Sequence, residues 1–336
     1  MRKRPAAAPI AVVGAGSWGT ALAVQFARSG RPVRLWGRDA VALRQMAEAR
    51  ENRRYLPGVA FPDSLVPCDD LRAGLDGVTD ILIAVPSDAF RETLTRIKPL
   101  LRGDERICWA TKGVELSTGK LPHQVVGEFI GNDRPMAVLS GPTFAAEVGR
   151  GLPTALTIAA NDEQFASDLA EALSGANFRA YTSTDIIGVE IGGAVKNVLA
   201  IGAGISDGLG FGANTRVAMI NRGLAEMTRL GIALGAKQDT FTGLAGMGDL
   251  LLTCTDNLSR NRRMGLAIAG GKTIEEAQAE IQQVVEGVPA ARAVHQLADR
   301  LGVEMPISQQ IYRILYEGTP PRAAVDALMG RALKPE

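Results

Sequence analysis

A short apolar run that leads into three spaced glycines is the feature that most constrains how this chain can fold. The run Ile10–Val13 reads as a buried strand and continues directly into Gly14, Gly16 and Gly19. The next residues, Thr20–Gly30, have the pattern of a helix that ends on glycine. Gly14 would permit a tight turn, Gly16 would let a pyrophosphate approach the backbone, and Gly19 would allow close packing. This order predicts a dinucleotide site at the first strand–helix connection; a glycine turn without a ligand is the alternative.

The first half of the chain alternates strand-like runs with helical patterns. Further helices are expected at Val41–Arg50, Ala89–Leu101 and Glu163–Leu173. Besides the first, the expected strands are Val33–Trp36, Ile81–Val85, Ile107–Ala110, Met136–Leu139, Ala155–Ala159 and Phe178–Tyr181. Such alternation predicts an α/β, Rossmann-like, doubly wound parallel sheet.

The pattern changes near residue 185, beyond which long helical stretches dominate. They are expected at Ile186–Ile205, Thr215–Leu234, Thr273–Gln283, Ala290–Leu301, Ser308–Glu317 and Ala323–Leu328. A chain of 336 residues can form two sizeable cores. We therefore expect a Rossmann-like domain over residues 1–185 and an all-helical domain over residues 186–336.

Composition excludes several classes of protein. The chain is 46% hydrophobic and 22% charged with a net charge of +1, so no broad basic field suggests nucleic acid or a membrane surface. Its three cysteines are scattered singly, without metal-ligand spacing, which suits a reducing cytoplasm. The apolar stretch Ile191–Ser206 is shorter than a membrane span and contains a lysine, so we expect a buried helix without stable membrane insertion. Met1–Pro9 is expected to be a tail.

Lys196 is the most unusual charged residue, because it is the only one between Glu190 and Asp207. Its neighbours are small and apolar, so desolvation should favour the neutral amine and lower its pKa. Such a lysine can donate or accept a proton in catalysis. The alternative is a lysine that reaches from the helix edge to solvent.

Polar residues also follow two of the predicted strands, at the edge where open α/β sheets bind ligands. Lys112 comes just after Ile107–Ala110, and Ser140–Thr143 comes after Met136–Leu139, although an ordinary turn would explain the latter equally well. Asp249 could hold an active-site lysine, with Thr253 on the same helical face, or could simply cap a helix.

The run Ser259–Arg263 combines arginines with hydroxyl and amide donors, which suits a phosphate. A solvated basic turn is the commoner explanation for such a run. Histidine is scarce, since only His123 and His295 occur, and neither lies near these segments in sequence. This argues against histidine acid–base chemistry and against a metal site.

Taken together, these segments resemble bacterial NAD(P)-dependent glycerol-3-phosphate dehydrogenase. The resemblance extends from about Ile10 to Leu333. It is carried by GAGSWGTALA, NRRYLPG, AVPSDAF, WATKG, SGPTFAAEV, GGAVKNVLAIGAGISDGLGFGANT, GLAGMGDLLLTCTDNLSRNRR and VVEG. The last three are far more specific than the glycine motif. The resemblance implies a helical domain like that of 6-phosphogluconate dehydrogenase.

The resemblance also implies a role for individual residues at matching positions. Lys196 matches the catalytic proton donor and acceptor, and Lys112 is implied to touch both cofactor and substrate. Residues implied to surround the substrate are Gly141, Thr143, Lys196, Asp249, Ser259, Arg260 and Asn261. Residues implied to bind the cofactor, beside the three glycines, are Ser17, Trp18, Arg38, Tyr55, Ala145, Arg260, Val284 and Glu286.

The implied reaction is reduction of dihydroxyacetone phosphate to sn-glycerol 3-phosphate, which supplies glycerophospholipid synthesis. NADPH/NADP or NADH/NAD is the cofactor, and no metal or nucleic acid is involved; a homodimer is left open. Arg38 follows the second strand where NAD-specific sites carry an acid, so we expect a preference for NADPH. Asp39 could instead favour NADH, but we expect it to cap the helix that starts near Val41.

Two other functions are weighed. β-Hydroxyacid and 6-phosphogluconate dehydrogenases share the two-domain design, but they usually place asparagine four residues after the catalytic lysine, where this chain has Ala200. A protein that senses NAD(H) without turnover would not need Lys196, Asp249 and Arg260. Both alternatives are therefore disfavoured.

Overall fold

The computed structural model describes residues 8–332. The chain divides into two compact units, of which the first comprises the chain up to Thr111 together with Pro122–Ile186. The second comprises Lys112–Leu121 together with the chain from Ile187 onward. The domain boundary expected at residue 185 stays a prediction, and the expected N-terminal tail lies outside the described residues except for Ala8 and Pro9.

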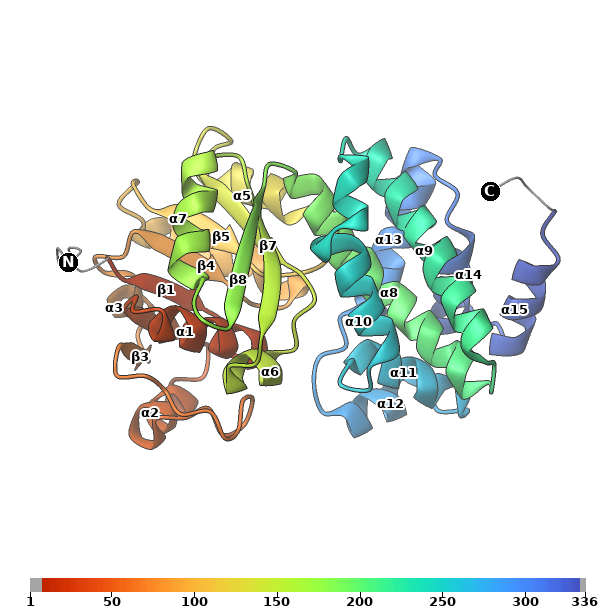
Figure 1. Ribbon diagram of the computed structural model, residues 1–336, viewed down its shortest axis with the longest axis horizontal. Coiled ribbons are helices and arrows are strands. Elements are labelled where there is room, and N and C mark those ends of the chain that lie inside the picture. Colours follow the sequence, from red (N-terminus) through yellow and green to blue (C-terminus); the bar gives the residue numbers. More distant parts are fainter. Residues whose placement is uncertain (1–7, 333–336) are drawn as a thin grey trace. The chain divides into compact units, whose positions relative to one another are not determined.

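The first unit is built on an eight-stranded sheet with the strand order β3-β2-β1-β4-β5-β6-β7-β8 (Figure 1). All neighbouring strands are parallel except β6 and β7, which pair antiparallel. The strands are β1 (Ile10–Val13), β2 (Val33–Trp36), β3 (Leu65–Cys68), β4 (Asp80–Ile83), β5 (Arg106–Trp109), β6 (Met136–Ser140), β7 (Thr154–Ala160) and β8 (Phe178–Ser183). Every residue of β1 and β6 is buried, as expected for strands covered on both faces.

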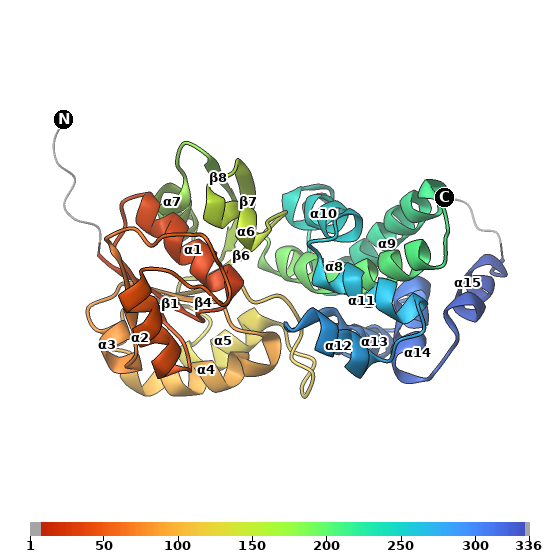
Figure 2. The same ribbon diagram turned by 90° about the horizontal axis from the view of Figure 1, so that it is seen from below.

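Helices cover both faces of this sheet, which makes it doubly wound. Figure 2 shows α1 and α7 on one face and α4 and α5 on the other, and α4 packs against α5. The α-helices are α1 (Ser17–Arg28), α2 (Ala40–Ala49), α3 (Leu71–Leu75), α4 (Phe90–Ile97), α5 (Pro122–Ile130), α6 (Ala145–Arg150) and α7 (Glu163–Leu173). Short 3₁₀ turns, Ser87–Ala89 and Lys98–Leu100, flank α4.

The Rossmann-like fold class expected from the sequence is confirmed, with two differences in detail. β3 is a strand that the sequence pattern did not reveal, because Pro67 interrupts it and proline lacks a donor for the ladder. Its place at the edge of the sheet is where a strand proline is tolerated. The antiparallel β6–β7 step also departs from the all-parallel expectation.

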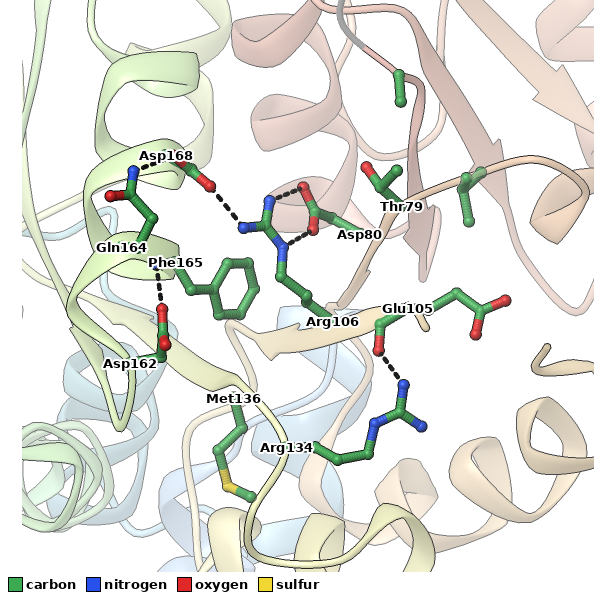
Figure 3. Close-up of polar contacts among 12 residues, drawn as sticks. Thr79, Asp80, Glu105, Arg106, Arg134, Met136, Asp162, Gln164, Phe165 and Asp168 are labelled. Atoms are coloured by element: carbon green, nitrogen blue, oxygen red, sulfur yellow. Dashed lines mark hydrogen bonds and ion pairs between the residues drawn. The ribbon is translucent and has the colours of Figure 1, made fainter. Parts of the chain in front are cut away.

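A group of charged residues around the buried Asp80 lies at the amino end of β4 and β5. Asp80 is fully buried and accepts hydrogen bonds from Arg106, at 2.6 Å from Nε and 3.1 Å from Nη2, and a third from Arg31. Arg106 also donates to Asp168 at 2.5 Å and lies over the ring of Phe165 (Figure 3). Burial opposes its charge, but the two carboxylates raise the pKa of Arg106 above its ordinary value. Arg106 therefore keeps its charge.

The second unit is helical. Its α-helices are α8 (Ile186–Gly208), α9 (Ala213–Ala233), α10 (Asp249–Thr255), α11 (Arg260–Ala269), α12 (Ile274–Ile281), α13 (Gly287–Leu301), α14 (Pro306–Tyr316) and α15 (Pro321–Met329). A 3₁₀ turn, η3 (Gln238–Thr242), and a π-helical turn, η4 (Leu244–Gly248), lead into α10. The helices expected from the apolar pattern are present, with ends that differ by a few residues.

α8 is the central helix of this core. It is the one described helix long and apolar enough to span a bilayer, but 94% of its apolar window is buried inside the protein. The expected buried helix is thereby confirmed. One hydrophobic core contains buried residues of α8, α9, α11 and α13, among them Leu199, Met227, Met264 and Val294.

Candidate active site

The glycine turn of the first unit has the geometry expected of a dinucleotide loop. Gly14 has φ +126°, and a Cβ on it would lie 2.5 Å from the carbonyl oxygen of Ala84, so only glycine fits. A Cβ on Gly19 would lie 1.9 Å from the Gly14 carbonyl oxygen, which shows that α1 packs against the loop itself. The Cβ direction of Gly16 is open space. The protein thus leaves room at Gly16, where a pyrophosphate is expected to approach.

The amino end of α1 is suited to an anion. Its N-cap is Gly16, no side chain in the described part of the chain caps it, and its first turn contains no acidic residue. The leading N–H groups and the helix dipole are therefore left for a negatively charged ligand. Ser17 and Trp18 lie in this first turn, and the buried indole Nε1 of Trp18 has no hydrogen-bond partner among residues 8–332.

The region after β2 agrees with the expectation for Asp39. Its Oδ1 accepts a hydrogen bond from the Ala42 N–H at 3.0 Å, so Asp39 caps α2 as predicted. Arg38, by contrast, is exposed at the carboxyl end of β2. Tyr55 lies half-buried in a turn after α2, with the Arg54 guanidinium 5.0 Å from its ring centroid.

The second unit brings two lysines onto one buried carboxylate. Asp249 is fully buried, and its Oδ1 lies 2.5 Å from Lys196 Nζ while its Oδ2 lies 2.6 Å from Lys112 Nζ. Lys196 also donates to Thr253 Oγ1 at 3.0 Å, and that hydroxyl donates to the Asp249 carbonyl at 2.6 Å. Asp249 thus binds both lysines. It is the first residue of α10 but does not cap the helix, since the N-cap is Gly248.

Electrostatics make Lys196 an unusual base. Burial lowers the pKa of Lys196 to about 8; the Asp249 carboxylate opposes this and the charge of Lys112 adds to it. Burial alone would raise the pKa of Asp249, but the two lysines hold it below its ordinary value. The site therefore combines a permanent carboxylate with an amine that exchanges its proton near neutral pH.

Glycines in α8 explain how these residues meet. A Cβ on Gly192 would lie 2.4 Å from the Ala245 carbonyl oxygen, so α8 lies directly against η4, and α10 with Asp249 follows from there. A Cβ on Gly204 would lie 2.0 Å from the carbonyl oxygen of Arg262, so α8 and α11 also touch backbone to backbone. Small residues in α8 thus allow both neighbouring helices to approach the segment that bears Lys196.

The basic run at 259–263 is the start of α11, not a solvated turn. Ser259 is the N-cap, and its Oγ accepts from the Arg262 N–H at 3.2 Å. Arg260 is half-buried. Burial lowers the pKa of its guanidinium, and the negative charge of Glu286 partly offsets this lowering. Within residues 8–332, no hydrogen bond engages the Arg260 guanidinium, whereas Arg262 donates to Asp207 at 2.6 Å.

Asn261 has a structural role that the sequence did not reveal. Its Nδ2 donates to Asn197 Oδ1 at 2.8 Å, and its Oδ1 accepts from the Gly287 N–H at 2.9 Å. The side chain therefore joins α8, next to Lys196, to the start of α13, next to Glu286. Asn197 was missed as a site residue, although a polar pair in an apolar helix was a signal for it.

The remaining expected residues are distributed over both units. Gly141, Thr143 and Ala145 follow β6 in the first unit, and Val284 and Glu286 precede α13 in the second. Gly141 has a backbone reason to be glycine, since a Cβ would lie 2.8 Å from the Cα of Leu156. Val284 is an apolar residue exposed to solvent. Their binding roles stay predictions.

Residues that could bind a metal ion do not form a cluster in the described part of the chain. Over residues 8–332, no group of three His, Cys, Asp or Glu residues could hold a metal ion. His295 stacks on Tyr312, with ring centroids 3.9 Å apart, as a packing residue would.

Comparisons with known proteins agree on one family. A model described as the NAD-dependent glycerol-3-phosphate dehydrogenase N-terminus matches residues 9–166, and the corresponding C-terminus model matches residues 185–326. This chain is 55% identical over 331 residues to a glycerol-3-phosphate dehydrogenase (NAD(P)+) of Tolumonas auensis, covering 98% of this chain and 99% of that one. A relative of the same description in Vibrio cholerae is 53% identical over 326 residues, covering 97% and 95%. The crystal structure of a glycerol-3-phosphate dehydrogenase from Coxiella burnetii matches with a TM-score of 0.94 and 52% identity, covering 97% of this chain and 100% of that one.

Proposed function

Because the chain belongs to the NAD-dependent glycerol-3-phosphate dehydrogenase family and is thus an NAD(P)-dependent oxidoreductase, we propose that it reversibly reduces dihydroxyacetone phosphate to sn-glycerol 3-phosphate. The observation that carries the proposal is Lys196, a buried lysine with its pKa lowered to about 8 and held by Asp249 and Thr253. Reduction of a ketone needs a proton donor of this kind at the developing alkoxide.

The first unit holds the cofactor in this proposal. The open space at Gly16 and the uncapped start of α1 fit a pyrophosphate, and the exposed Arg38 fits an adenosine 2′-phosphate. Ser17, Trp18 and Tyr55 would complete this part of the site, with Ala145, Val284 and Glu286 as further contacts. A bound nicotinamide supplies the hydride, and all other steps fall to the side chains of this chain.

The lysine cluster performs the proton transfer. In reduction, the Lys196 ammonium gives a proton to the C2 oxygen of the substrate; in oxidation, the neutral amine takes the proton from the C2 hydroxyl. Asp249 and Thr253 orient the Nζ atom, and the charge of Lys112 stabilises the negative charge that develops on the oxygen.

The start of α11 binds the phosphate. Arg260 supplies a permanent charge with a planar set of donors, and Ser259 lies beside it at the helix N-terminus. Asn261 has two Nδ2 protons, of which one is given to Asn197, so the other can serve the phosphate. Gly141 and Thr143 are proposed as further substrate contacts.

The cellular setting is also part of the proposal. Three free cysteines, two of them buried, suit the reducing cytoplasm, and the product would supply glycerophospholipid synthesis there. A near-neutral charge and the buried α8 support the absence of nucleic-acid partners and of stable membrane insertion. The oligomeric state stays open, with a homodimer as one alternative.

A spectrophotometric assay tests the proposed function. NADPH or NADH oxidation at 340 nm is followed with dihydroxyacetone phosphate and, as the matched substrate, unphosphorylated dihydroxyacetone. We expect rapid oxidation with the phosphorylated ketone and kcat/KM lower by about tenfold or more without the phosphate. Cofactor binding without turnover would support the sensing protein instead.

A further inference from the structure

Asn52, in the turn after α2, is a fully buried polar residue with no role in the site described so far. Its Nδ2 donates to the Ala15 carbonyl oxygen at 3.0 Å and to Thr20 Oγ1 at 2.9 Å. Its Oδ1 accepts from the Tyr55 N–H at 3.1 Å. One amide thus bonds the glycine loop, α1 and the turn that bears Tyr55.

The bond to Ala15 has a direct consequence for the next residue. A trans peptide is planar, so the carbonyl of Ala15 and the N–H of Gly16 point in opposite directions. Asn52 pulls the carbonyl toward the interior, and the Gly16 N–H is thereby directed away from it. Gly16 is only partly buried and its Cβ direction is open, so the space beside it is accessible to a ligand.

The turn around Asn52 is braced independently of its side chain. The Arg50 guanidinium donates to the carbonyl oxygens of Leu65 at 3.0 Å and Pro62 at 2.6 Å. Glu51 Oε1 accepts from the Gly58 N–H at 2.7 Å. A variant at Asn52 should therefore keep this turn, whereas no other side chain bonds the Ala15 carbonyl among residues 8–332.

We propose that Asn52 is a positioning residue for the cofactor, which holds the Ala15–Gly16 peptide with its N–H toward the pyrophosphate. The inference rests on the proposed cofactor role of the glycine loop. Without Asn52 the peptide can rotate and present a carbonyl oxygen to the phosphates, which repels them. The effect is specific to ligands that contain the pyrophosphate.

The test compares Asn52→Ala and the isosteric Asn52→Asp with wild type, using NADPH and adenosine 2′-monophosphate, which lacks the pyrophosphate. We expect the Kd for NADPH to rise about tenfold or more, the size of a lost charge-assisted hydrogen bond. The Kd for adenosine 2′-monophosphate, measured by competition, should rise by less than about threefold. The kcat at saturating NADPH should stay within about threefold of the wild-type value.

Asn52→Asp adds a pH readout. Its ionised carboxylate cannot donate to Ala15, but its protonated form can, and burial raises the pKa of such a carboxyl. The loss of NADPH affinity relative to wild type should therefore shrink as the pH falls. The matched control is Thr20→Val, which removes another buried partner of Asn52 and should leave the NADPH Kd within about twofold.

Three results would overturn the proposal. The first is an NADPH Kd within about twofold of wild type in folded Asn52 variants. The others are an equal loss of affinity for NADPH and for adenosine 2′-monophosphate, or a loss of NADPH affinity in Asn52→Asp that does not change with pH. A wild-type protein that binds NADPH but does not turn over dihydroxyacetone phosphate would contradict the proposed reaction and leave the Asn52 comparison intact.

Discussion

Two fully buried aspartates, one in each unit, are each held between two cations, and the cations differ. Asp80 lies between Arg31 and Arg106 at the amino end of the sheet, and Asp249 lies between Lys112 and Lys196 at the start of α10. The amino end of a parallel sheet is the edge away from ligands.

The choice of cation separates a structural cluster from a chemical one. Arginine keeps its proton at any physiological pH and bonds a carboxylate through a planar fork, so the Asp80 cluster only holds the strands together. Lysine loses its proton readily when buried, and burial lowers the pKa of Lys196 to about 8. We propose on this basis that arginines in this protein fix position or bind phosphate, and that the lysine cluster exchanges protons.

The largest expected effect is on turnover, from Lys196→Met. Removing the proton donor should lower kcat by roughly 10²–10⁴ while the Kd for NADPH changes little. Thr253→Val is the control, because it removes a partner of Lys196 but keeps the amine; it should cost about tenfold or less. Steady-state kinetics with dihydroxyacetone phosphate decide, and a near-normal kcat in Lys196→Met would sink the assignment.

The next effect is on stability, from Asp80→Asn. Removing the charge takes the counter-ion from the buried Arg31 and leaves the partly buried Arg106 with Asp168 alone, which should cost about 3–5 kcal/mol. Asp168→Asn is matched to it, since Asp168 also accepts from Arg106 but is 37% exposed, and it should cost about 1 kcal/mol or less. Urea unfolding measures both, and kcat of the folded Asp80 variant should stay within about twofold. Equal costs would mean that burial does not set the difference.

A smaller effect is expected at the phosphate. Arg260→Ala should weaken the binding of dihydroxyacetone phosphate by about 1.5–3 kcal/mol. It should also weaken cofactor binding, since Arg260 is proposed to contact both ligands. The binding of unphosphorylated dihydroxyacetone should be weakened much less. The ratio of kcat/KM for the two substrates is the measurement, and an unchanged ratio would show that Arg260 is not the phosphate anchor.

The smallest effect is expected from Arg38→Ala, because Arg38 is exposed and its charge is screened by water. NADPH kcat/KM should fall by roughly three- to tenfold with NADH little changed. A wild type that strongly prefers NADH, or a variant with an unchanged ratio of the two cofactors, would contradict the interpretation of Arg38.

Periodicity and turn chemistry were enough to predict most of the fold. β1, β2 and α7 were predicted with the bounds that the structure gives, and Asp39 was predicted as a cap. β3 was not, because Pro67 removes the strand signal, and the strand forms only because β2 offers an edge for it. The strand β7 was predicted, but its antiparallel direction relative to β6 was not, because a local pattern does not encode long-range pairing.

The candidate site was predicted unevenly for a related reason. Lys196 was found because its isolation among apolar residues is a local signal. Asp249 looked like a helix cap, and its bonds to two lysines depend on the contact between α8 and η4 at Gly192. Asn261 and Asn52 act through partners far away in sequence, which no spacing rule reveals.

The pH dependence of kcat tests most directly that Lys196 is the titrating group. Reduction needs the ammonium, so with a pKa of about 8 its kcat should be constant below that pH and fall up to tenfold per pH unit above it. Oxidation needs the neutral amine, so its kcat should rise with pH and level off above about 8. In Lys196→Arg, whose guanidinium stays protonated, both transitions should disappear along with most of the activity. A wild-type enzyme whose kcat shows no transition between pH 7 and pH 9.5 in either direction would contradict the account.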